Sequence, residues 1–577
     1  MKAFFTSKIT SGVLLILHGL GLLVLTAEYG FSFPKWLEPG ILLFYIILLS
    51  ISIAFTTGAY FFSKKDLNVN ILIFDLLSLI FIGYCVHRQF DIHDTTISNW
   101  IRYAVLLVLI RVFATPRISY KRSFLTPARL FIFSFLALIL LGTFLLMLPR
   151  ATLHGISLVD ALFTSTSAVC VNGLVVVNTS SFTRFGQTII MLLIQAGGLG
   201  ILTFASYFSY FFKGGATYEN QIALNDISNT GKLGDVFTTL GRILVITFWV
   251  EFFGAILIFI NLDPAMFPSY WNRVYFSIFH SISSFCNAGF STMPEGLMNE
   301  GLVDNYPLQL VIIALFVFGG LGFPIVINVV RYVNYVVTRY FLWFVSGKTR
   351  YKPWILTLSS KINLITTFSL TLTGTLFIYI MESDNVLSVH EGLGKFTTAL
   401  FTATTPRTAG YNTIDFRQLH FSSLMLIIMF MWIGASPAST GGGIKTSTFA
   451  IAILNAISLA KGKTKIEIFR REIADISVRR AFATMTLSLV VIGFAILFIA
   501  RMERRIPLPD IIFECFSAYS TTGLSLGVTA DLSDWSKLAL MTTMFTGRVT
   551  MLSVLIALFR KVRTPNYRYP TDEIMIN

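Results

Sequence analysis

This chain of 577 residues is short of the side chains from which catalytic and metal sites are built. It holds four cysteines and seven histidines, and no pair of them has a metal-binding spacing. It also contains no nucleophile motif and no phosphate-binding loop, so the sequence gives no sign of an enzyme or of ATPase chemistry. The cysteines, Cys85, Cys170, Cys286 and Cys515, are predicted to be free thiols.

Charge is also scarce, and apolar residues take its place. Charged residues make up 13% of the chain and hydrophobic residues 55%, with a mean hydropathy of +0.73. This composition lies far outside the soluble range, and apolar runs long enough to cross a bilayer recur along the whole length. We predict an all-α, multi-pass membrane protein with twelve spans. The spans are 11–28, 40–62, 69–86 and 100–115, then four pairs: 129–148 with 186–212, 237–260 with 308–338, 361–381 with 421–456, and 481–500 with 535–560.

The net charge of +15 is distributed as a signal of membrane orientation. Loop 461–480 and the C-terminal tail are rich in lysine and arginine, whereas loops 291–307 and 382–389 contain neither. By the positive-inside rule, the basic loops and both termini are cytoplasmic. Three arginines within 501–505 argue against this orientation, since they would face outward. The basic charge therefore needs no nucleic acid to explain it, and the first apolar run is predicted to be an uncleaved helix.

Four short segments of the chain resemble one another, and each carries a glycine at the same place. They read TSAVCVNGL (166–174), ISSFCNAGF (282–290), TTPRTAGY (404–411) and FSAYSTTGL (516–524). The glycines are 116, 121 and 113 residues apart, so one unit occurs four times. Six residues before each glycine stands a hydroxyl side chain: Ser167, Ser283, Thr404 and Ser517. In a membrane protein, four equivalent segments are expected to meet at the axis of a pore.

The stretch before each glycine is too short to span a bilayer of ~30 Å and is predicted to be a re-entrant half-helix. These stretches are 158–168, 271–284, 391–404 and 508–518. Glycine permits positive φ at the turn that follows, and four such turns can direct backbone carbonyl oxygens at a dehydrated cation. The two residues before each glycine have neutral side chains, so the sequence does not offer a filter built of carboxylates. The predicted filter residues are Val171, Asn172, Gly173, Asn287, Ala288, Gly289, Thr408, Ala409, Gly410, Thr521, Thr522 and Gly523. The competing interpretation is that these glycines only break helices in ordinary loops.

A second glycine recurs 24 residues after three of the filter glycines and marks a possible gate. In the third copy the segment runs GASPASTGGGIKT (434–446), which should interrupt an apolar span. Such a break must line a water path, so we interpret it as a loop across the pore. Arg548 lies at the matching depth of the fourth copy, either as a barrier to cations or as a structural residue. The predicted gate residues are Gly441, Gly442, Gly443, Lys445 and Arg548.

These motifs together resemble the Trk/Ktr/HKT superfamily of potassium transporters. The filter segments, TPRTAGYNT (405–413), GASPASTGGGIKTST (434–448) and TGRVTM (546–551) are similar to those of bacterial TrkH/KtrB pore-forming subunits. The resemblance implies four helix–pore-helix–helix units around one pseudo-fourfold pore in the bacterial plasma (inner) membrane. It assigns the glycines to a K⁺ filter of backbone carbonyls, 434–446 to the intramembrane loop and Arg548 to the pore arginine.

The resemblance also implies partners. Such subunits usually form homodimers among membrane lipids and work with a cytosolic ring protein that binds the nucleotide, so no cofactor beyond the transported K⁺ is expected on this chain. The ring would dock on cytoplasmic surfaces such as 213–236, 339–360 and 461–480. The function expected is channel-like K⁺ uptake. The alternative is a secondary transporter coupled to Na⁺ or H⁺, a symporter, although such folds normally use inverted repeats.

The predicted organisation places an extension before the repeats. Its boundaries are 1–128 for the N-terminal extension, 129–212, 235–338, 361–456 and 481–560 for the four repeats, and 561–577 for a cytoplasmic tail. The extension is longer than the family pattern requires. Its four spans could suggest a voltage sensor, with Arg102 and Arg111 on the fourth span and Asp75 as a partner. Two arginines are too few for a strong sensor, and packing around the core and dimer geometry are the preferred interpretation.

Overall fold

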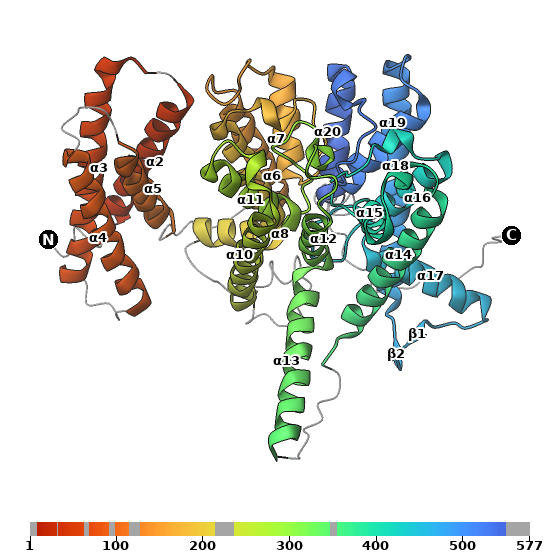
Figure 1. The fold of residues 1–577 in the computed structure, drawn as a ribbon. Coiled ribbons are helices and arrows are strands. Elements are labelled where there is room, and N and C mark those ends of the chain that lie inside the picture. Colours follow the sequence, from red (N-terminus) through yellow and green to blue (C-terminus); the bar gives the residue numbers. More distant parts are fainter. Residues whose placement is uncertain are drawn as a thin grey trace, which may run out of the picture.

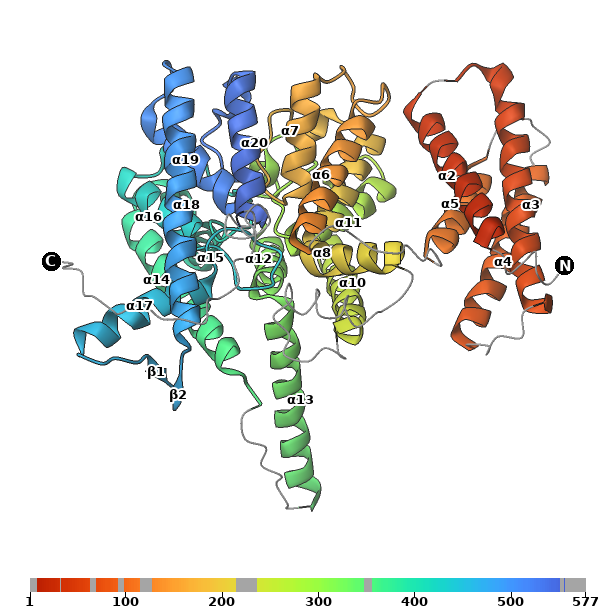
Figure 2. The ribbon, with the colours of Figure 1, turned by 180° about the vertical axis from the view of Figure 1, so that it is seen from behind.

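The computed structural model is almost entirely helical and places the four repeats side by side, with a separate bundle at one edge (Figures 1 and 2). It describes residues 8–31, 33–62, 69–91, 98–114, 127–213, 236–346, 355–549 and 555. The predicted tail 561–577, nearly all of the predicted docking surface 213–236 and the part 347–354 of the docking surface 339–360 lie outside these residues.

The N-terminal extension forms a bundle of four helices, drawn in red in Figure 1. They are α2 (Lys8–Gly30), α3 (Glu38–Phe62), α4 (Val69–Asp91) and α5 (Asn99–Ala114), with a short 3-10 turn η1 (Lys35–Leu37) before α3. Arg111 on α5 binds both carboxylate oxygens of Asp75 on α4, at 2.6 and 2.8 Å, and Arg102 binds Glu28 at 2.7 Å. Both arginines are therefore engaged in ion pairs inside the bundle.

Each repeat consists of an outer helix, a short pore helix and an inner helix. The first repeat has α6 (Pro127–Leu146), α7 (Leu158–Val169) and α8 (Arg184–Lys213); the second has α10 (Val236–Asn261), α11 (Tyr270–Phe285), α12 (Tyr306–Leu321) and α13 (Phe323–Ser346). The third has α14 (Leu358–Met381), α15 (Gly392–Thr404), α16 (Phe421–Trp432) and α17 (Thr446–Ala460), and the fourth has α18 (Asp475–Met502), α19 (Leu508–Ser520) and α20 (Asp534–Val549). Short 3-10 turns lie in the loops: η2 (Thr179–Ser181), η4 (Pro264–Met266), η5 (Gly296–Met298), η6 (Val386–Val389), η7 (Phe416–Gln418) and η8 (Thr529–Asp531).

The pore helices α7, α11, α15 and α19 are short, and two of them begin at a capping serine. Ser157 and Ser269 accept hydrogen bonds from the backbone N–H groups of Asp160 and Asn272, which caps α7 and α11. The four helices have 12, 16, 13 and 13 residues, and at 1.5 Å per residue none can cross a bilayer of ~30 Å. Their C-terminal halves are buried, which directs their last carbonyls into the protein.

Four described helices are long and apolar enough to cross a membrane, and a bent pair raises this to as many as five. The predicted span at 308–338 is broken in the structure, because α12 and α13 meet at an angle of 106° at Gly322. Gly322 has φ of +85°, which a glycine adopts without steric cost. The helix α8 is also kinked, at Gly200, and the third inner helix is interrupted between Trp432 and Thr446.

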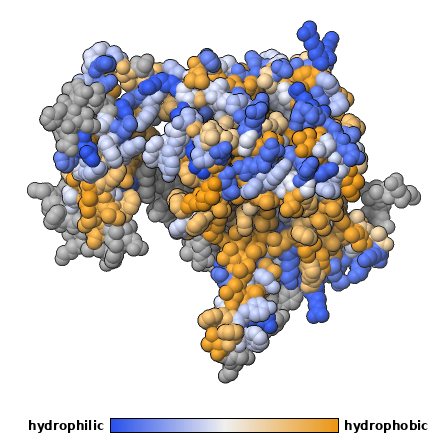
Figure 3. Space-filling model, viewed as in Figure 1, coloured by the Kyte–Doolittle hydropathy of each residue, from blue (hydrophilic) through white to orange (hydrophobic). Residues whose placement is uncertain are grey.

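Two elements extend from the foot of the repeats (Figure 1). Helix α13 protrudes and runs past the predicted repeat boundary at 338 to Ser346, and strands β1 (Glu467–Ile468) and β2 (Arg471–Glu472) form a two-stranded antiparallel hairpin after α17. On the face seen in Figure 3, apolar side chains gather over the lower half of the repeats and along α13. This apolar surface is what a lipid environment requires.

Candidate functional site

The four glycine segments share one backbone conformation. The residue two before each glycine is left-handed, although it carries a side chain. Its φ is +55°, +60°, +72° and +50° at Val171, Asn287, Thr408 and Thr521, and the glycines have φ of +95°, +69°, +77° and +86°. Left-handed backbone costs an ordinary residue roughly 1–2 kcal/mol. In the described part of the chain only seven non-glycine residues have positive φ, and four of them stand at this one position, so the strain is specific to these segments.

The four glycines lie against one another in sequence order and form a ring. A Cβ atom placed on Gly173 would stand 2.5 Å from the carbonyl oxygen of Ala288, and one on Gly289 would stand 2.9 Å from the Cα of Gly410. A Cβ on Gly410 would stand 3.4 Å from the Cα of Gly523, and one on Gly523 would stand 2.8 Å from the Cα of Gly173. Each copy thus contacts the next, and the fourth contacts the first. No side chain fits at the glycines, so backbone atoms line this point.

Hydroxyl groups of the pore helices hold the segments from behind. Ser167 and Ser517 each accept the N–H of the filter glycine of their own copy at 3.1 Å, and Ser283 donates to the carbonyl of Phe290 at 2.8 Å. The third copy differs from the other three. Thr404 bonds back to Leu400 within its helix, and Thr405 instead donates to the carbonyl of Tyr411 at 2.6 Å.

The shift from Thr404 to Thr405 has a local cause. Thr405 still has helical backbone, with φ of −59° and ψ of −34°, but Pro406 has no N–H with which to continue the helical hydrogen bonds. The third pore helix therefore ends six residues before its glycine, whereas the first and second end four residues before theirs. The amide of Ala409 then bonds to the carbonyl of Thr405 at 3.0 Å, so the hydroxyl one residue later is the one in reach.

The second recurrent glycine packs against the end of the pore helix in three copies. A Cβ on Gly197, Gly319 or Gly547 would overlap the carbonyl oxygen of Val169, Phe285 or Tyr519, and each of these carbonyls lies four residues before its filter glycine. Gly319 stands 30 residues after Gly289, whereas Gly197 stands 24 residues after Gly173, yet both make the same contact. The second copy therefore has an insertion, which lies in the loop 291–307 before α12. In the third copy Gly434 instead faces the carbonyl of Gly442, inside the loop.

The predicted intramembrane loop 434–446 corresponds to the segment 433–445 between α16 and α17, which lies directly against the predicted filter segments. A Cβ on Gly441 would overlap the hydroxyl of Thr408, and one on Gly442 would overlap that of Thr521, so both glycines contact the left-handed residues of copies three and four. The loop is also bonded to the break in the second repeat. Ser436 N–H donates to the carbonyl of Gly320 at 2.9 Å, and Phe323 N–H donates to the carbonyl of Ala438 at 3.2 Å.

A buried arginine and a partly buried lysine hold this loop. The Arg548 guanidinium donates to the carbonyl of Thr440 in the loop and, at 2.6 Å, to that of Gly197 in the first repeat. Lys445 donates from Nζ to the carbonyl of Gly441 at 2.6 Å. Arg548 is 4% exposed, and the partners the structure gives for it and for Lys445 are backbone carbonyls. The structure therefore brings the five predicted gate residues together beneath the ring.

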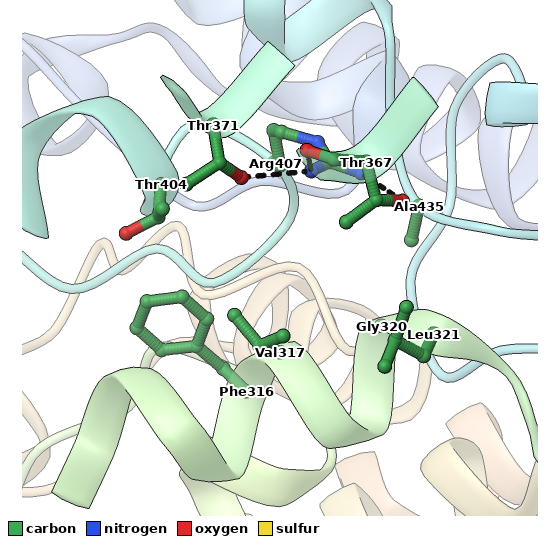
Figure 4. A pocket seen from close by; sticks show the side chains of 9 residues that line it. All are labelled: Phe316, Val317, Gly320, Leu321, Thr367, Thr371, Thr404, Arg407 and Ala435. Atoms are coloured by element: carbon green, nitrogen blue, oxygen red, sulfur yellow. Dashed lines mark hydrogen bonds between the residues drawn. The ribbon is translucent and has the colours of Figure 1, made fainter. Parts of the chain in front are cut away.

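Sequence reasoning gave no role to Arg407, which lies three residues before the third filter glycine. It borders a cavity of about 20 Å³ between α12 and α14, room for one water molecule or small ion (Figure 4). Its guanidinium makes contacts of 3.3 to 3.5 Å with Thr367 and Thr371, and its Nε has no hydrogen-bond partner among the described residues. A lone arginine in a run of threonines carried no signal of this arrangement.

The described residues contain no group of three or more His, Cys, Asp or Glu side chains that could hold a metal ion. The four cysteines are free and buried, as predicted. What the site offers is a ring of four strained backbone turns, with a glycine-rich loop and two cations packed on it.

Comparison with known proteins gives a consistent family. A family model described as "TrkH: Cation transport protein" matches residues 94–568. The chain is 34% identical over 452 residues to "Ktr system potassium uptake protein B" of Bacillus subtilis, covering 78% of this chain and 96% of that protein. It is also 34% identical over 465 residues to "Potassium/sodium uptake protein NtpJ" of Enterococcus hirae, covering 79% and 98%. The crystal structure of the potassium transporter TrkH from Vibrio parahaemolyticus has the same fold, with a TM-score of 0.59 at 17% identity over 84% of this chain and 97% of that one.

Proposed function

Because this chain belongs to the TrkH family of cation transport proteins, we propose that it takes up K⁺ through a single channel-like pore. The observation that carries the proposal is the ring of Gly173, Gly289, Gly410 and Gly523. Two of the relatives that the chain resembles over most of their length are named for potassium uptake, and one is named for potassium and sodium. The family is one of transporters rather than enzymes.

In this proposal the backbone oxygens of the twelve filter residues replace the hydration shell of K⁺. The support is chemical. The segments carry no carboxylate, the glycines leave space only for backbone, and four pore helices end at the ring, so their partially negative C-terminal ends favour a cation. A membrane potential, inside negative, contributes about 2.3 kcal/mol per charge per 100 mV, enough to accumulate a monovalent cation without ATP hydrolysis.

The loop 434–446 is proposed to be the gate, with Arg548 as its latch. Gly441 and Gly442 lie against two filter residues, and Arg548 joins the loop to the first repeat. Opening requires the loop to leave this position, and its glycines make that rearrangement sterically possible. Arg548 also places a positive charge beneath the ring, which opposes the passage of cations while the loop is closed.

The second candidate is a transporter coupled to Na⁺ or H⁺. The printed name of the Enterococcus hirae relative, which includes sodium, is the observation that favours it. The repeats argue for the channel-like mechanism, because they form a ring of four parallel copies, whereas coupled transporters normally use paired inverted repeats.

We further propose that the chain works as a homodimer in the bacterial plasma membrane, with both termini cytoplasmic and a cytosolic nucleotide-binding ring as its partner. Three relatives are named as proteins of a Ktr system, which supports an assembly of more than one component. On this chain itself no cofactor is proposed other than the transported K⁺.

The test is cation flux into proteoliposomes that contain this chain alone, with K⁺, Rb⁺ and Na⁺ compared at an imposed inside-negative potential. Entry of K⁺ and Rb⁺ well above that of Na⁺ supports the filter. Entry that needs a Na⁺ or proton gradient supports the coupled transporter. If the wild-type chain is silent and Arg548→Ala restores flux, the pore is gated; silence in both variants contradicts the channel-like mechanism.

A further inference from the structure

The outer ends of the second and fourth filter segments are held by the same contact. His280 stands nine residues before Gly289, and its Nε2 lies 2.9 Å from the hydroxyl of Ser291, two residues after that glycine. Glu514 stands nine residues before Gly523, and it accepts the hydroxyl of Ser525, two residues after that glycine. The correspondence becomes visible when the repeats are aligned on their glycines.

The two serines are bonded in the same way. Ser291 Oγ accepts the N–H of Met293 at 3.1 Å, and Ser525 Oγ accepts the N–H of Gly527 at 2.8 Å. Each serine therefore forms a turn over the next two residues and points its remaining hydroxyl proton at the pore helix. A side chain of the pore helix that has an acceptor atom can form a hydrogen bond with this proton.

Both pore-helix side chains are placed to accept it. His280 Nδ1 lies 3.0 Å from the carbonyl of Phe276, which fixes the proton on Nδ1 and leaves Nε2 of the neutral ring as an acceptor. The imidazole is stacked on Phe276, with ring centroids 3.7 Å apart, and has no solvent exposure. Glu514, 2% exposed, also accepts the Leu526 N–H at 3.2 Å and the Thr529 hydroxyl at 2.9 Å.

The first and third copies lack this contact. At the same two positions the first copy has Thr164 and Val175, and Thr164 donates back to its own helix at the Asp160 carbonyl, 2.8 Å away. The third copy has Phe401 and Asn412. Because neighbours in the ring follow sequence order, copies two and four face each other across the axis. The fourfold ring thus has a twofold pattern of support at its outer end.

We propose that His280 and Glu514 are positioning residues that set the outer width of the ring, and through it the preference for one monovalent cation over another. This rests on the proposed function of the ring as a filter. Neither side chain reaches the axis. Each acts through a serine that lies two residues after the filter glycine of its copy. Loss of one contact therefore releases the second or the fourth segment, whereas the first and third segments, which lack this contact, keep their own packing.

The direct test exchanges residues between repeats. Ser291→Val and Ser525→Val install the side chain that the first copy carries at Val175, a replacement that one quarter of the ring already accommodates. Uptake of K⁺ and Na⁺ into proteoliposomes gives a KM, a maximal rate and a Na⁺/K⁺ ratio for each variant. We expect the Na⁺/K⁺ ratio to rise roughly three- to tenfold in each, which is the scale of one lost hydrogen bond. The control is Val175→Ala, which changes the same position in a copy that has no serine contact to lose and should leave the ratio unchanged.

Conservative variants separate positioning from packing. Glu514→Gln and His280→Gln keep an acceptor oxygen near the serine and should stay within about twofold of the wild-type ratio, whereas Glu514→Met removes the acceptor. Because Glu514 also accepts the Leu526 N–H and the Thr529 hydroxyl, Glu514→Met should raise the ratio at least as much as Ser525→Val. In a double-mutant cycle, adding Ser525→Val to Glu514→Met should change the ratio no further.

The outcomes distinguish this inference from the function on which it rests. Serine variants that fold, transport K⁺ and keep the wild-type Na⁺/K⁺ ratio overturn it, as does a lowered thermal midpoint with no change of ratio. If a serine variant fails to fold, an unchanged ratio in Glu514→Met overturns it instead. A wild-type chain that does not discriminate K⁺ from Na⁺ overturns the filter itself.

Discussion

Lys537 of the fourth repeat donates from Nζ to Asp160 of the first at 2.8 Å, joining side chains that are 377 residues apart in sequence. Both lie in the first turn of their helices, α20 and α7, and the Lys537 side chain is 9% exposed. Other neighbours are joined differently: Arg184 bonds to Asn272, and the hydroxyl of Tyr306 lies 2.9 Å from His390. The ion pair therefore joins the fourth repeat to the first, the two neighbouring repeats that no loop of the chain connects directly.

Removing this pair should weaken the closure of the ring. Lys537→Met leaves a partly buried carboxylate without its cation, and we expect a loss of about 3 kcal/mol in unfolding free energy, the low end for a buried pair, because Asp160 keeps 21% of its side chain exposed. Thermal midpoints of purified protein measure this. Adding Asp160→Asn should recover most of the loss; if the double variant is as unstable as both single losses combined, the two residues are not coupled.

Substitution of one filter glycine should impair selectivity by a clash rather than by backbone strain alone. Gly173→Ser places a Cβ 2.5 Å from the Ala288 oxygen at φ of +95°, so we expect the K⁺ over Na⁺ preference to fall at least tenfold in a flux assay. Gly155→Ser is the control, because it has φ of +80° with nothing within 4 Å of its Cβ. If both variants lost selectivity equally, the cause would be backbone strain and not the clash.

Releasing the loop should open the pore. Arg548→Met removes both carbonyl contacts, and deletion of 438–443 removes most of the loop, so each should raise K⁺ flux in the absence of any partner by tenfold or more. Arg184→Met, which removes an inter-repeat arginine that does not touch the loop, should leave flux near the wild-type level. A folded deletion variant with lower flux would contradict the gate.

The N-terminal bundle is expected to act on stability and not on voltage dependence. Asp75→Asn leaves Arg111 without its carboxylate partner inside the bundle, which should lower the thermal midpoint by several degrees. The dependence of K⁺ flux on membrane potential should be unchanged, measured over a series of imposed potentials. A steeper or shallower voltage dependence would revive the interpretation of this bundle as a sensor.

The sequence predicted the helical class, the family and the four pore helices, because apolar runs and repeated glycines depend on short-range pattern. It did not indicate the places where a single residue redirects the backbone. Pro406 moved the supporting hydroxyl from Thr404 to Thr405, and Gly322 bent a span that hydropathy describes as continuous. Hydropathy records length and composition, and neither is changed by one residue with positive φ.

The contacts of His280 and Glu514 were within reach of the sequence but unrecognised there. Both residues stand nine positions before their glycines, Gly289 and Gly523. Histidine and glutamate are chemically dissimilar, however, so a comparison of the repeats by residue similarity does not match them. What they share is an acceptor atom facing a serine, and only the folded geometry brings that into view. Arg407 was missed for a different reason. The residues around it come from α12, α14 and α15 and from the loop at Ala435, which are far apart in the sequence.

A ring made from one chain has four quarters that mutate independently. In an assembly of four identical subunits, any substitution alters every quarter at once, so ion preference changes in one large step. Here a single codon alters one quarter, and the residues around Gly173, Gly289, Gly410 and Gly523 have already diverged while the glycines coincide. Natural variation can therefore adjust this ring in graded increments, and the same property makes each quarter a separate experimental handle.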